Sequence, residues 1–467
     1  MTELTVRLDV GAVPGRPSYT IEPFEPDPAS PAPVIAIVGL GYVGLPTALT
    51  ARANGARTIG IDTSESRLKA IREQQVDLVS TDHLQLSTRL DDEDFVLTSS
   101  VAALGEADAV LICVPTPVDA QRAPDLRMLR DACADAVRHA RAGQVLILTS
   151  TSHPGSTREL LADPLRERGF VVGKDIFVAS SPERIDPGNK TPHSAVPRVL
   201  GGVTPECLER AAAIIGLLTD DVVQVTSADA AEMTKLLENS FRAVNIAFAN
   251  EFADACEAIG VDPREIVDAA ATKPYGFMPF YPGTGVGGHC IPCDPHYLLS
   301  RLHDQGVAAP ILASAMDAIA ARPHQIVDDI ASRLARQGRA LAEARVLVVG
   351  VAYKPGIEDI RESPGIEIVT ELIRRNAEVD IHDPLVPSVP IGEQQILLSV
   401  KQPDATAYDA VLVNTLHPGF DYDWLADAPL LLDPSGTTRS YGPRVTSTPR
   451  PAAEPRFTST VGRSRAG

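Results

Sequence analysis

Short apolar runs alternate with helical patterns in two long stretches of the chain. Between residues 34 and 220 the runs read "VIAIVG", "TIGID", "AVLICV", "VLILTS" and "DIFVAS". Between residues 340 and 440 they read "RVLVVG", "EVDIHD", "AVLVNT" and "PLLLDP". Buried strands that alternate with helices are typical of βαβ units, so each stretch predicts a parallel sheet.

A long helical pattern lies between these two stretches. Residues 227–258 contain no glycine or proline and carry apolar side chains at spacings of three and four. Further helix is expected up to about residue 338. The predicted fold class is therefore α/β, with two Rossmann-like, doubly wound domains joined by a long central helix. We expect a cleft between the two sheets.

Composition sets the outer boundaries of these domains. Residues 1–33 are rich in proline and predict a disordered leader, and residues 441–467 predict a disordered, mildly basic tail. Between them we expect a dinucleotide-binding domain at 34–220, a central helical region with a cysteine loop at 221–338, and a second α/β domain at 339–440.

Charge and cysteine content argue against several classes of protein. A net charge of −19 makes nucleic acid an improbable partner. No uninterrupted apolar stretch of about 18 residues is present, which disfavours a membrane-spanning protein. The first residues lack the apolar core of a secretion signal, and the six cysteines are irregularly spaced. We therefore expect a reduced, cytoplasmic protein.

The segment "VIAIVGLGYVGLP" contains G-x-G-x-x-G at Gly39, Gly41 and Gly44, between an apolar run and a helical pattern. Such glycines allow a tight turn and bring backbone N–H groups to a pyrophosphate at a helix N-terminus. The next run ends in Asp62, 21 residues after Gly41. A carboxylate there accepts hydrogen bonds from ribose hydroxyls and repels a 2′-phosphate. We therefore predict NAD, rather than NADP, as the cofactor.

Two further runs end in polar segments, at the strand ends that face the ligand in a doubly wound sheet. In "CVPTP", Thr116 is a candidate neighbour of the nicotinamide, although a plain proline turn explains this segment equally well. In "TSTSHPGST" the candidate is Thr151, whereas His153 is interpreted as a loop residue.

The long helical pattern places Lys235 and Asn239 four residues apart, so that both donors share one face. Such a pair can stabilise a developing alkoxide. A solvated pair on the protein surface is the competing interpretation.

The stretch "PGTGVGGHCIPCDP", residues 282–295, has four interpretations. A zinc site needs four ligands, but the chain has no second C-x-x-C. A thioredoxin-type dithiol usually opens a helix after a strand, whereas a glycine loop comes first here. An inert buried cysteine is the ordinary case, but glycines 283, 285, 287 and 288 let the backbone approach a ligand and expose Cys290. We favour a nucleophilic Cys290, with its thiolate stabilised by Lys235, and no metal.

A nucleophilic cysteine together with NAD indicates a particular reaction. An alcohol loses a hydride directly, but an aldehyde carbon must become tetrahedral before it loses a second one. A cysteine makes it tetrahedral as a thiohemiacetal, which hydride loss converts into a thioester that water hydrolyses. One site can therefore oxidise an alcohol to a carboxylate with two NAD.

The motifs resemble, in order and spacing, those of the UDP-sugar 6-dehydrogenases (nucleotide-sugar dehydrogenases) over roughly residues 34–436. The matching segments are "VGLGYVGLP", "STSHPGST", "SPERIDPG", "EMTKLLENSFRAVNIAFANE", "FYPGTGVGGHCIPCDP" and "GVAYKPGIEDIRESPG". The resemblance implies an N-terminal NAD domain, a central helix that forms a homodimer or higher homo-oligomer, a C-terminal UDP-binding domain, and a role in polysaccharide biosynthesis.

The resemblance also implies roles for single residues. The catalytic set comprises the nucleophile Cys290, the oxyanion donors Lys235 and Asn239, Asp294 as an acid that assists the lysine and the water, Glu183 for water or proton handling, and Thr151 beside the reacting centre. Cofactor contacts are expected at Gly39, Gly41, Tyr42, Val43, Gly44, Asp62, Arg67 and Thr116. Substrate contacts are expected at Arg184, Arg242, Tyr281, Gly283, Gly287, Lys354 and Arg361.

The choice of sugar rests on weaker signals. Enzymes that use UDP-glucose commonly carry a lysine where Cys293 stands, and "GGHCIPCDP", "SPERIDPG" and "FDYDW" resemble the branch that uses 2-acetamido sugars. We expect oxidation of UDP-N-acetylglucosamine at C6, with UDP-N-acetylmannosamine or UDP-glucose as alternatives. Remoter alternatives are a one-step hydroxyacid dehydrogenase and a non-catalytic nucleotide-sugar sensor. Relatives often carry D-T-R where this chain reads "DPSG", and Arg439 is the candidate substitute for the missing arginine.

Overall fold

The computed structural model describes residues 32–441, except 77, 79, 120, 185–194, 220, 289 and 393–394. The expected leader and tail therefore lie almost entirely outside the described residues. The chain divides into two compact units, within the helix α7 (Ala228–Ile259). Unit 1 runs up to Thr116 and continues over Leu126–Lys235, and unit 2 comprises Pro117–Asp125 and the chain from Leu236 onward.

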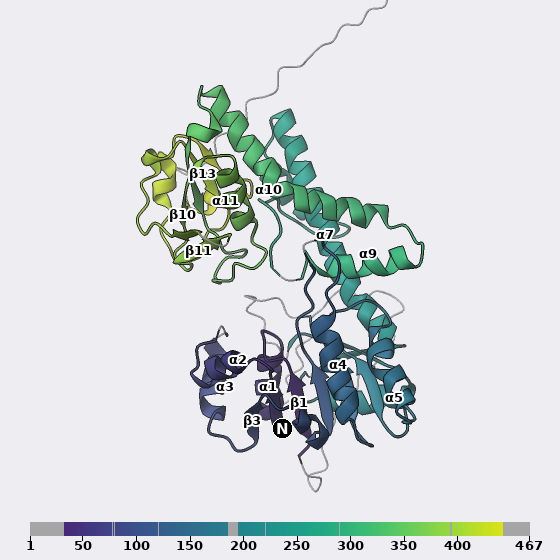
Figure 1. The fold of residues 1–467 in the computed structure, drawn as a ribbon. Coiled ribbons are helices and arrows are strands. Elements are labelled where there is room, and N and C mark those ends of the chain that lie inside the picture. Colours follow the sequence, from purple (N-terminus) through teal and green to yellow (C-terminus); the bar gives the residue numbers. More distant parts are fainter. Residues whose placement is uncertain are drawn as a thin grey trace, which may run out of the picture. The chain divides into compact units, whose positions relative to one another are not determined.

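Unit 1 is built on an eight-stranded sheet with the order β3-β2-β1-β4-β5-β6-β7-β8 (Figure 1). The strands are β1 (Val34–Val38), β2 (Arg57–Ile61), β3 (Phe95–Thr98), β4 (Ala109–Ile112), β5 (Val145–Leu148), β6 (Phe177–Ser180), β7 (Arg198–Gly202) and β8 (Val222–Val225). All neighbours are parallel except β6 and β7. The strand order reverses between β1 and β4, which marks the place where doubly wound sheets bind ligands.

The five apolar runs predicted in this unit all form strands, whereas β3, β7 and β8 were not predicted. β3 and β8 are short and only partly buried, and β7 ends in two glycines. The helices of the unit are α1 (Gly44–Ala53), α2 (Glu65–Arg72), α3 (Ser80–Arg89), α4 (Arg127–His139), α5 (Asp163–Glu167) and α6 (Pro205–Ile215), with the turns η1 (Val101–Glu106) and η2 (Arg158–Ala162). The core contains the apolar side chains of β1 and those of α1 that face it.

The predicted long helix is confirmed as α7, which has 32 residues. It is followed by α8 (Pro263–Ala271), α9 (Asp294–Asp304) and α10 (Pro310–Arg336), which continues through Pro323. Residues 273–293 between α8 and α9 contain no helix or strand among the described positions. The glycine and cysteine motif therefore lies in a loop, apart from its last two residues, which begin α9. No helix in the described part of the chain is both long and apolar enough to traverse a bilayer.

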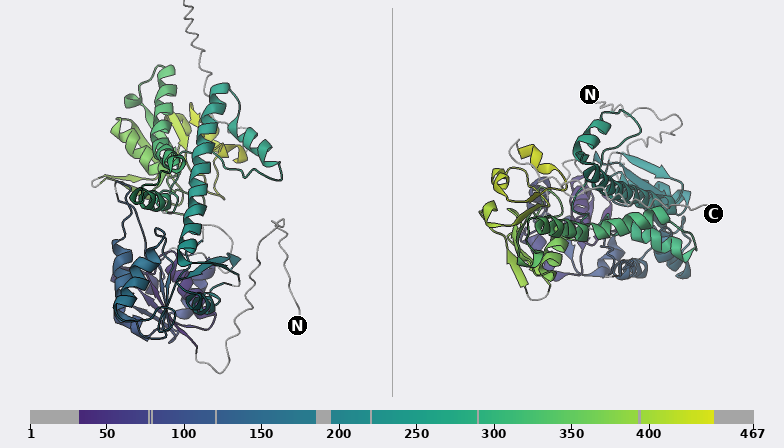
Figure 2. Two further views of the ribbon diagram at one scale, coloured as in Figure 1. Left: turned by 90° about the vertical axis from the view of Figure 1, so that its right-hand side faces the viewer. Right: turned by 90° about the horizontal axis from the view of Figure 1, so that it is seen from above.

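Unit 2 contains a second parallel sheet, with the order β10-β9-β13-β14. Its strands lie in the green to yellow part of the chain in Figure 2. Its strands are β9 (Arg345–Val349), β10 (Glu378–His382), β13 (Ala410–Val413) and β14 (Leu431–Leu432), and a hairpin joins β11 (Ser388–Ile391) to β12 (Gln395–Leu398). α10 and α11 (Pro364–Arg374) pack on one face, and the other face is covered by the segment around Tyr408, Tyr422 and Leu425. The predicted α/β architecture with two Rossmann-like sheets and a long helix is confirmed.

Candidate active site

The three glycines of the first turn have different surroundings. Gly39 adopts a positive φ of 86°, and a Cβ on Gly44 would lie only 1.8 Å from the Gly39 carbonyl oxygen. A Cβ on Gly41 would meet no atom within 4 Å. Gly39 and Gly44 are thus required by packing, whereas Gly41 leaves open space beside the N-terminus of α1. This open cradle fits the pyrophosphate of NAD.

Asp62 lies directly after β2, beside the same turn. Its carboxylate accepts hydrogen bonds from the Leu40 N–H at 2.9 Å and the Ser64 N–H at 2.9 Å, and the side chain remains partly exposed. Arg67 Nε donates to the Leu40 carbonyl at 2.8 Å and so braces the turn from α2. Tyr42 is exposed, and Val43 is the residue that precedes α1. The acid is therefore fixed in place with part of its surface open to a ribose.

Three neighbouring strands of unit 1 end in candidate residues. Thr116 is buried after β4, and Thr151 is half-buried after β5. Ser150 joins these ends because its hydroxyl donates to the Val114 carbonyl at 2.7 Å. The Glu183 N–H after β6 lies 3.4 Å from the Thr149 carbonyl that accepts from it. The structure thus brings Thr116, Thr151 and Glu183 to one edge of the sheet.

The Glu183 carboxylate is held by a buried arginine that sequence reasoning missed. Arg198 Nη2 donates to Glu183 Oε2 at 2.6 Å, and both side chains are almost fully buried. Glu183 Oε1 accepts from the Arg184 N–H at 2.7 Å, and the Arg184 guanidinium donates to the Pro197 carbonyl at 2.7 Å. The orientation of Glu183 is therefore fixed, and the partner on β7 could not be found because that strand was not predicted.

The candidate residues around the reacting thiol come together at α7 and α9. Asn239 Nδ2 donates to Asp294 Oδ2, and Asp294, the first residue of α9, is only 2% exposed. The Asp294 N–H donates to the carbonyl of the half-buried Cys290 at 2.8 Å. Lys235 is buried one turn before Asn239 on the same helix. α7 thus presents the two donors Lys235 and Asn239. α9 supplies the Asp294 carboxylate, which orients the Asn239 amide.

The two cysteines of the C-x-x-C have different environments. Cys293 is buried, and burial, together with the neighbouring Asp294, raises the pKa of its thiol to about 12. Its sulfur is also within hydrogen-bonding reach of the Val118 backbone. α9 begins immediately after Cys293, and a loop rather than a strand precedes the motif among the described positions. A protonated, buried Cys293 lies beside the Val118 backbone, whereas Cys290 is half-buried.

The glycines before Cys290 allow close packing against the β9–α11 loop of the same unit. A Cβ on Gly287 would lie 2.5 Å from the Tyr353 Cβ, one on Gly288 2.8 Å from the Tyr353 ring, and one on Gly285 2.7 Å from Pro364. A Cβ on Gly283 would have no neighbour closer than 3.9 Å. Three of these glycines therefore have a packing role, and substrate contact at Gly283 and Gly287 remains a prediction.

Several residues that were not among the predicted site residues hold this glycine loop in place. Asn250 Oδ1 accepts from the Gly283 N–H at 2.8 Å, and Arg322 Nε donates to the Gly283 carbonyl at 3.1 Å. Thr284 Oγ1 donates to Asn414 Oδ1 at 2.5 Å. The sequence offers no signal for these contacts, because the partners come from α7, α10 and the end of β13.

Two further candidate substrate residues belong to unit 2, Tyr281 directly before the loop and Arg242 on α7. The Tyr281 hydroxyl donates to Asp268 Oδ1 at 2.7 Å, and the Arg264 guanidinium lies 4.8 Å from the centre of the Tyr281 ring. Arg242 is half-buried on α7. Tyr281 thus presents an exposed aromatic face that is already oriented from α8.

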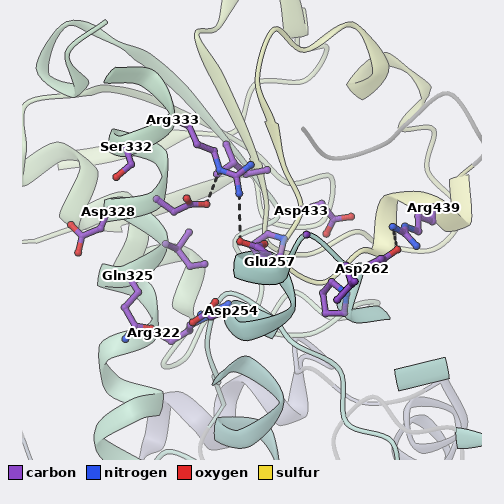
Figure 3. Close-up of a pocket in the computed structure, with 17 residues that line it drawn as sticks. Asp254, Glu257, Asp262, Arg322, Gln325, Asp328, Ser332, Arg333, Asp433 and Arg439 are labelled. Atoms are coloured by element: carbon purple, nitrogen blue, oxygen red, sulfur yellow. Dashed lines mark hydrogen bonds and ion pairs between the residues drawn. The ribbon is translucent and has the colours of Figure 1, made fainter. Parts of the chain in front are cut away.

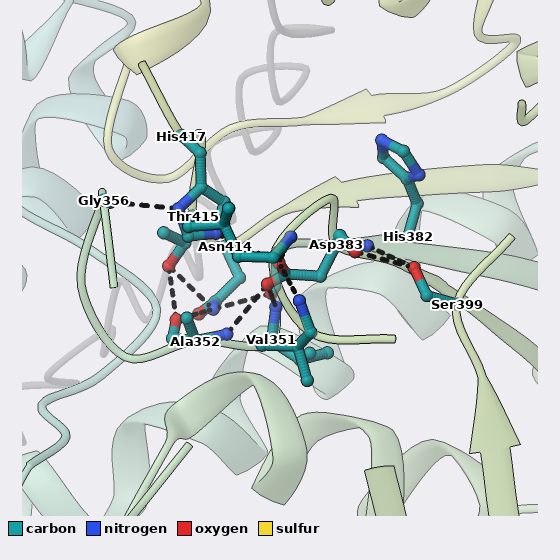
Figure 4. Close-up of polar contacts among 12 residues, drawn as sticks. Val351, Ala352, Gly356, His382, Asp383, Ser399, Asn414, Thr415 and His417 are labelled. Atoms are coloured by element: carbon teal, nitrogen blue, oxygen red, sulfur yellow. Dashed lines mark hydrogen bonds and ion pairs between the residues drawn. The ribbon is translucent and has the colours of Figure 1, made fainter. Parts of the chain in front are cut away.

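The β9–α11 loop carries Lys354 and Arg361 and is anchored by Asp383 (Figure 4). Asp383 Oδ2 accepts from the Val351 N–H at 2.8 Å and the Ala352 N–H at 3.1 Å. His417 Nε2 lies 3.2 Å from Asp383 Oδ1, and His417 Nδ1 accepts from the Gly356 N–H at 3.0 Å.

These contacts determine which side chains of the loop are open. The Arg361 guanidinium pairs with Asp359 at 2.6 Å, whereas Lys354 is half-buried. Lys354 and Arg361 both remain candidates for a phosphate contact.

Unit 2 also contains a cavity of about 700 Å³ between the end of α7, α10 and the segment after β14 (Figure 3). Arg322 pairs there with Asp254 at 2.8 Å, and Arg333 lies 3.8 Å from Glu257. Arg439 pairs with Asp262, so the candidate substitute for the missing arginine already has a partner. None of the predicted catalytic residues lines this cavity. In the described part of the chain no group of three metal-ligating side chains is found.

Three family models match the chain in succession. Residues 34–217 match the NAD-binding domain of the UDP-glucose/GDP-mannose dehydrogenase family, residues 229–318 its central domain and residues 347–439 its UDP-binding domain. The chain belongs to the UDP-glucose/GDP-mannose dehydrogenase family. It is an NAD-dependent nucleotide-sugar dehydrogenase whose first unit carries the NAD-binding domain.

Similar members of the family act on acetamido sugars according to their names. The chain is 31% identical to UDP-N-acetyl-D-glucosamine 6-dehydrogenase of Pseudomonas aeruginosa, over 83% of this chain and 91% of that protein. It is 34% identical to UDP-N-acetyl-D-mannosamine dehydrogenase of Escherichia coli strain K12, over 76% and 86%. The solved structure of UDP-D-ManNAc dehydrogenase from Pyrococcus horikoshii gives a TM-score of 0.76 at 30% identity, over 83% and 90%. The relatives agree on the nucleotide-sugar class and differ in the sugar.

Proposed function

We propose that this dehydrogenase oxidises C6 of UDP-N-acetylglucosamine to the uronic acid in two successive steps at Cys290. The observation that carries the proposal is the Asn239–Asp294 hydrogen bond next to the Cys290 carbonyl, with Lys235 one turn away on the same helix. Relatives of comparable similarity are named for other acetamido sugars, so the sugar must be tested directly.

The first oxidation needs donors at the C6 oxygen and a base that takes the hydroxyl proton, which we assign to the buried Asp294 carboxylate, but it needs no thiol. NAD held at the turn of Gly39, Gly41 and Gly44 would supply the hydride acceptor for the C6 carbon. Lys235 and Asn239 donate hydrogen bonds to the oxygen as it gains negative charge, and Asp294 orients the Asn239 amide so that it points there. The C6 carbon is already tetrahedral, so Cys290 has no covalent role in this step.

The second oxidation needs a covalent bond to Cys290. Its sulfur adds to the C6 aldehyde, and the carbonyl electrons move to the oxygen that Lys235 and Asn239 stabilise. Loss of a second hydride gives the thioester. Water then adds to the thioester carbon, the carbon–sulfur bond breaks, and the thiol regains a proton while the acid is released. Asp294, buried beside Asn239, is the carboxylate that we assign to orient that water.

A panel of UDP-N-acetylglucosamine, UDP-N-acetylmannosamine, UDP-N-acetylgalactosamine and UDP-glucose tests the proposal. The expected result is the highest kcat/KM with UDP-N-acetylglucosamine and two NADH formed per sugar oxidised. One NADH per sugar would identify a simple alcohol dehydrogenase, and a higher kcat/KM on UDP-glucose would refute the choice of substrate. No NADH with any sugar would indicate a non-catalytic sensor.

We further infer that the chain forms a homodimer through α7. Exposed apolar side chains recur along this helix at Met233, Leu237, Phe241, Phe248 and Phe252. A second copy of the same stripe is the simplest cover for it, since the helix offers this apolar face along most of its length. Light scattering should give twice the chain mass, and Leu237→Asp combined with Phe248→Asp should give monomers. A monomeric wild-type chain would refute the dimer.

A further inference from the structure

One buried carboxylate on α7 has no role in the chemistry described so far. Glu232 lies three residues before Lys235 and is only 3% exposed. Its Oε2 accepts from the Gly155 N–H at 2.7 Å. Its Oε1 accepts from the Thr157 N–H at 2.8 Å and from the Thr157 hydroxyl at 2.6 Å. All three partners belong to the short segment that follows β5.

This segment also carries Thr151, a candidate neighbour of the reacting centre. Gly155 has a positive φ of 96°, and Ser156 bonds back to the His153 carbonyl through its hydroxyl at 2.7 Å, so the turn is well defined. Ser150, at the other end, is tied to the end of β4. The Glu232 carboxylate therefore connects, through hydrogen bonds, the helix that carries Lys235 to the segment that carries Thr151.

The protonation state of Glu232 controls this contact. Burial raises the pKa of Glu232 to about 7, although the hydrogen bonds from Thr157 and Gly155 oppose the rise, and Asp229 adds to it. The other charged groups nearby are Arg158, which lies 3.7 Å from Asp229, and Glu159, which lies 3.9 Å from His153. Every partner of Glu232 donates a hydrogen, so an ionised carboxylate accepts all three bonds, and a protonated one must give up part of that set.

We propose that Glu232 is a positioning residue whose hydrogen bonds fix Lys235 relative to the segment that carries Thr151. Protonation of Glu232 weakens these hydrogen bonds. The inference rests on the proposed oxidation at C6. It adds to that reaction a carboxylate that touches neither substrate nor cofactor and that makes turnover sensitive to acid near neutral pH.

The test compares Glu232→Gln with the wild-type enzyme across pH 5.5–9, using the best UDP-sugar of the panel. In this variant an NH2 group replaces one carboxylate oxygen, so that a donor faces the donors of Gly155 and Thr157. We expect kcat to fall about tenfold to 100-fold, because displacement of a catalytic group by a fraction of an ångström is costly, while both KM values change little. The wild-type kcat should decline as pH falls through about 7, and Glu232→Gln should lack that decline. Glu232→Asp should restore part of kcat together with the pH dependence.

Two matched controls separate Glu232 from its neighbours. Asp229→Asn, one turn earlier and half-exposed, should leave kcat at pH 9 unchanged and move the acidic decline to lower pH, because Asp229 raises the pKa of Glu232, and His153→Gln should keep the decline where it is. Hydrogen exchange of the Gly155 and Thr157 amides should accelerate in Glu232→Gln, a readout that needs no turnover.

Each outcome decides the matter. If folded Glu232→Gln keeps the wild-type kcat or the acidic decline, Glu232 is not the positioning residue. If His153→Gln alone removes the decline, the proton binds elsewhere and the inference is wrong. If Glu232→Gln unfolds, Glu232→Asp is measured instead. An acidic decline of kcat together with faster exchange of the Gly155 and Thr157 amides supports the inference. Wild-type amide exchange together with an unchanged kcat overturns it. A wild-type enzyme without activity on any UDP-sugar instead refutes the proposed function.

Discussion

The first turns of the two Rossmann-like sheets begin in the same way. Gly39 and Gly350 both have positive φ values, 86° and 81°. Each glycine N–H donates to the last carbonyl of the neighbouring strand, at Ile61 in one sheet at 2.8 Å and at His382 in the other at 2.7 Å. Each turn is then held by an aspartate after that strand, which accepts from the residue that follows the glycine.

The two aspartates differ in what else surrounds them. Asp62 is partly exposed, and α1 begins five positions after Gly39. Asp383 is only 2% exposed, is bonded by four backbone N–H groups and lies against His417. In the second sheet the loop from residue 351 to 363 precedes α11. The same local geometry thus leaves one acid partly exposed for a ligand and uses the other as an internal anchor, so that the candidate ligand groups of the second sheet are Lys354 and Arg361 on the longer loop.

Paired glycine substitutions should separate the two turns most sharply. Gly44→Ala places a Cβ 1.8 Å from the Gly39 carbonyl oxygen and should weaken NAD binding about 100-fold or more, with UDP-sugar binding retained. Gly350→Ala places a Cβ 2.0 Å from the Thr415 carbonyl oxygen. It should weaken UDP-sugar binding, with NAD binding retained. Titration calorimetry with each ligand measures both.

Gly41→Ala is the matched control for that pair. Its Cβ would enter open space, so the melting temperature should stay at the wild-type value while NAD affinity still falls. An unchanged NAD affinity would mean that the cradle beside α1 does not hold the pyrophosphate.

Asp383→Asn should destabilise the protein by about 2–3 kcal/mol, because it leaves buried N–H donors without a charged acceptor. Burial opposes ionisation of Asp383, but His417 and the Ala352 and Val351 N–H groups outweigh it and hold its pKa below the usual value. An acid with a lowered folded pKa stabilises the fold above its unfolded pKa, and this contribution is lost as pH falls through the folded value. Wild type should therefore lose its advantage over Asp383→Asn below about pH 4. Urea unfolding at pH 3 to 7 checks this, and a pH-independent difference would argue against an ionised anchor.

Asp62→Ala should have the smallest effect of the three. Because Asp62 is partly exposed and serves a ligand, stability should change little. The preference for NAD over NADP should narrow about tenfold, since the repulsion of a 2′-phosphate is removed. Steady-state kinetics with both cofactors give the ratio, and an unchanged ratio would show that Asp62 does not face the ribose.

The sequence predicted those features that depend on local pattern. The apolar runs, the long helix and the first glycine turn were visible because each is encoded within a few consecutive residues. β7, and with it Arg198 opposite Glu183, was missed because paired glycines weaken the strand pattern. The anchors Asp383 and Arg322 were missed because their partners are far away in sequence, and only tertiary packing brings them together.

The two cysteines of the C-x-x-C decide the central claim, which is covalent oxidation at Cys290. The direct measurement supplies the UDP-sugar 6-aldehyde with NAD to Cys290→Ala and Cys293→Ser. Cys293 is buried and protonated, so Cys293→Ser should form the acid at a rate close to wild type. Cys290→Ala should form almost none, a loss of several powers of ten, yet still bind both ligands and slowly reduce the aldehyde with NADH. Near-normal acid formation by Cys290→Ala would contradict the account.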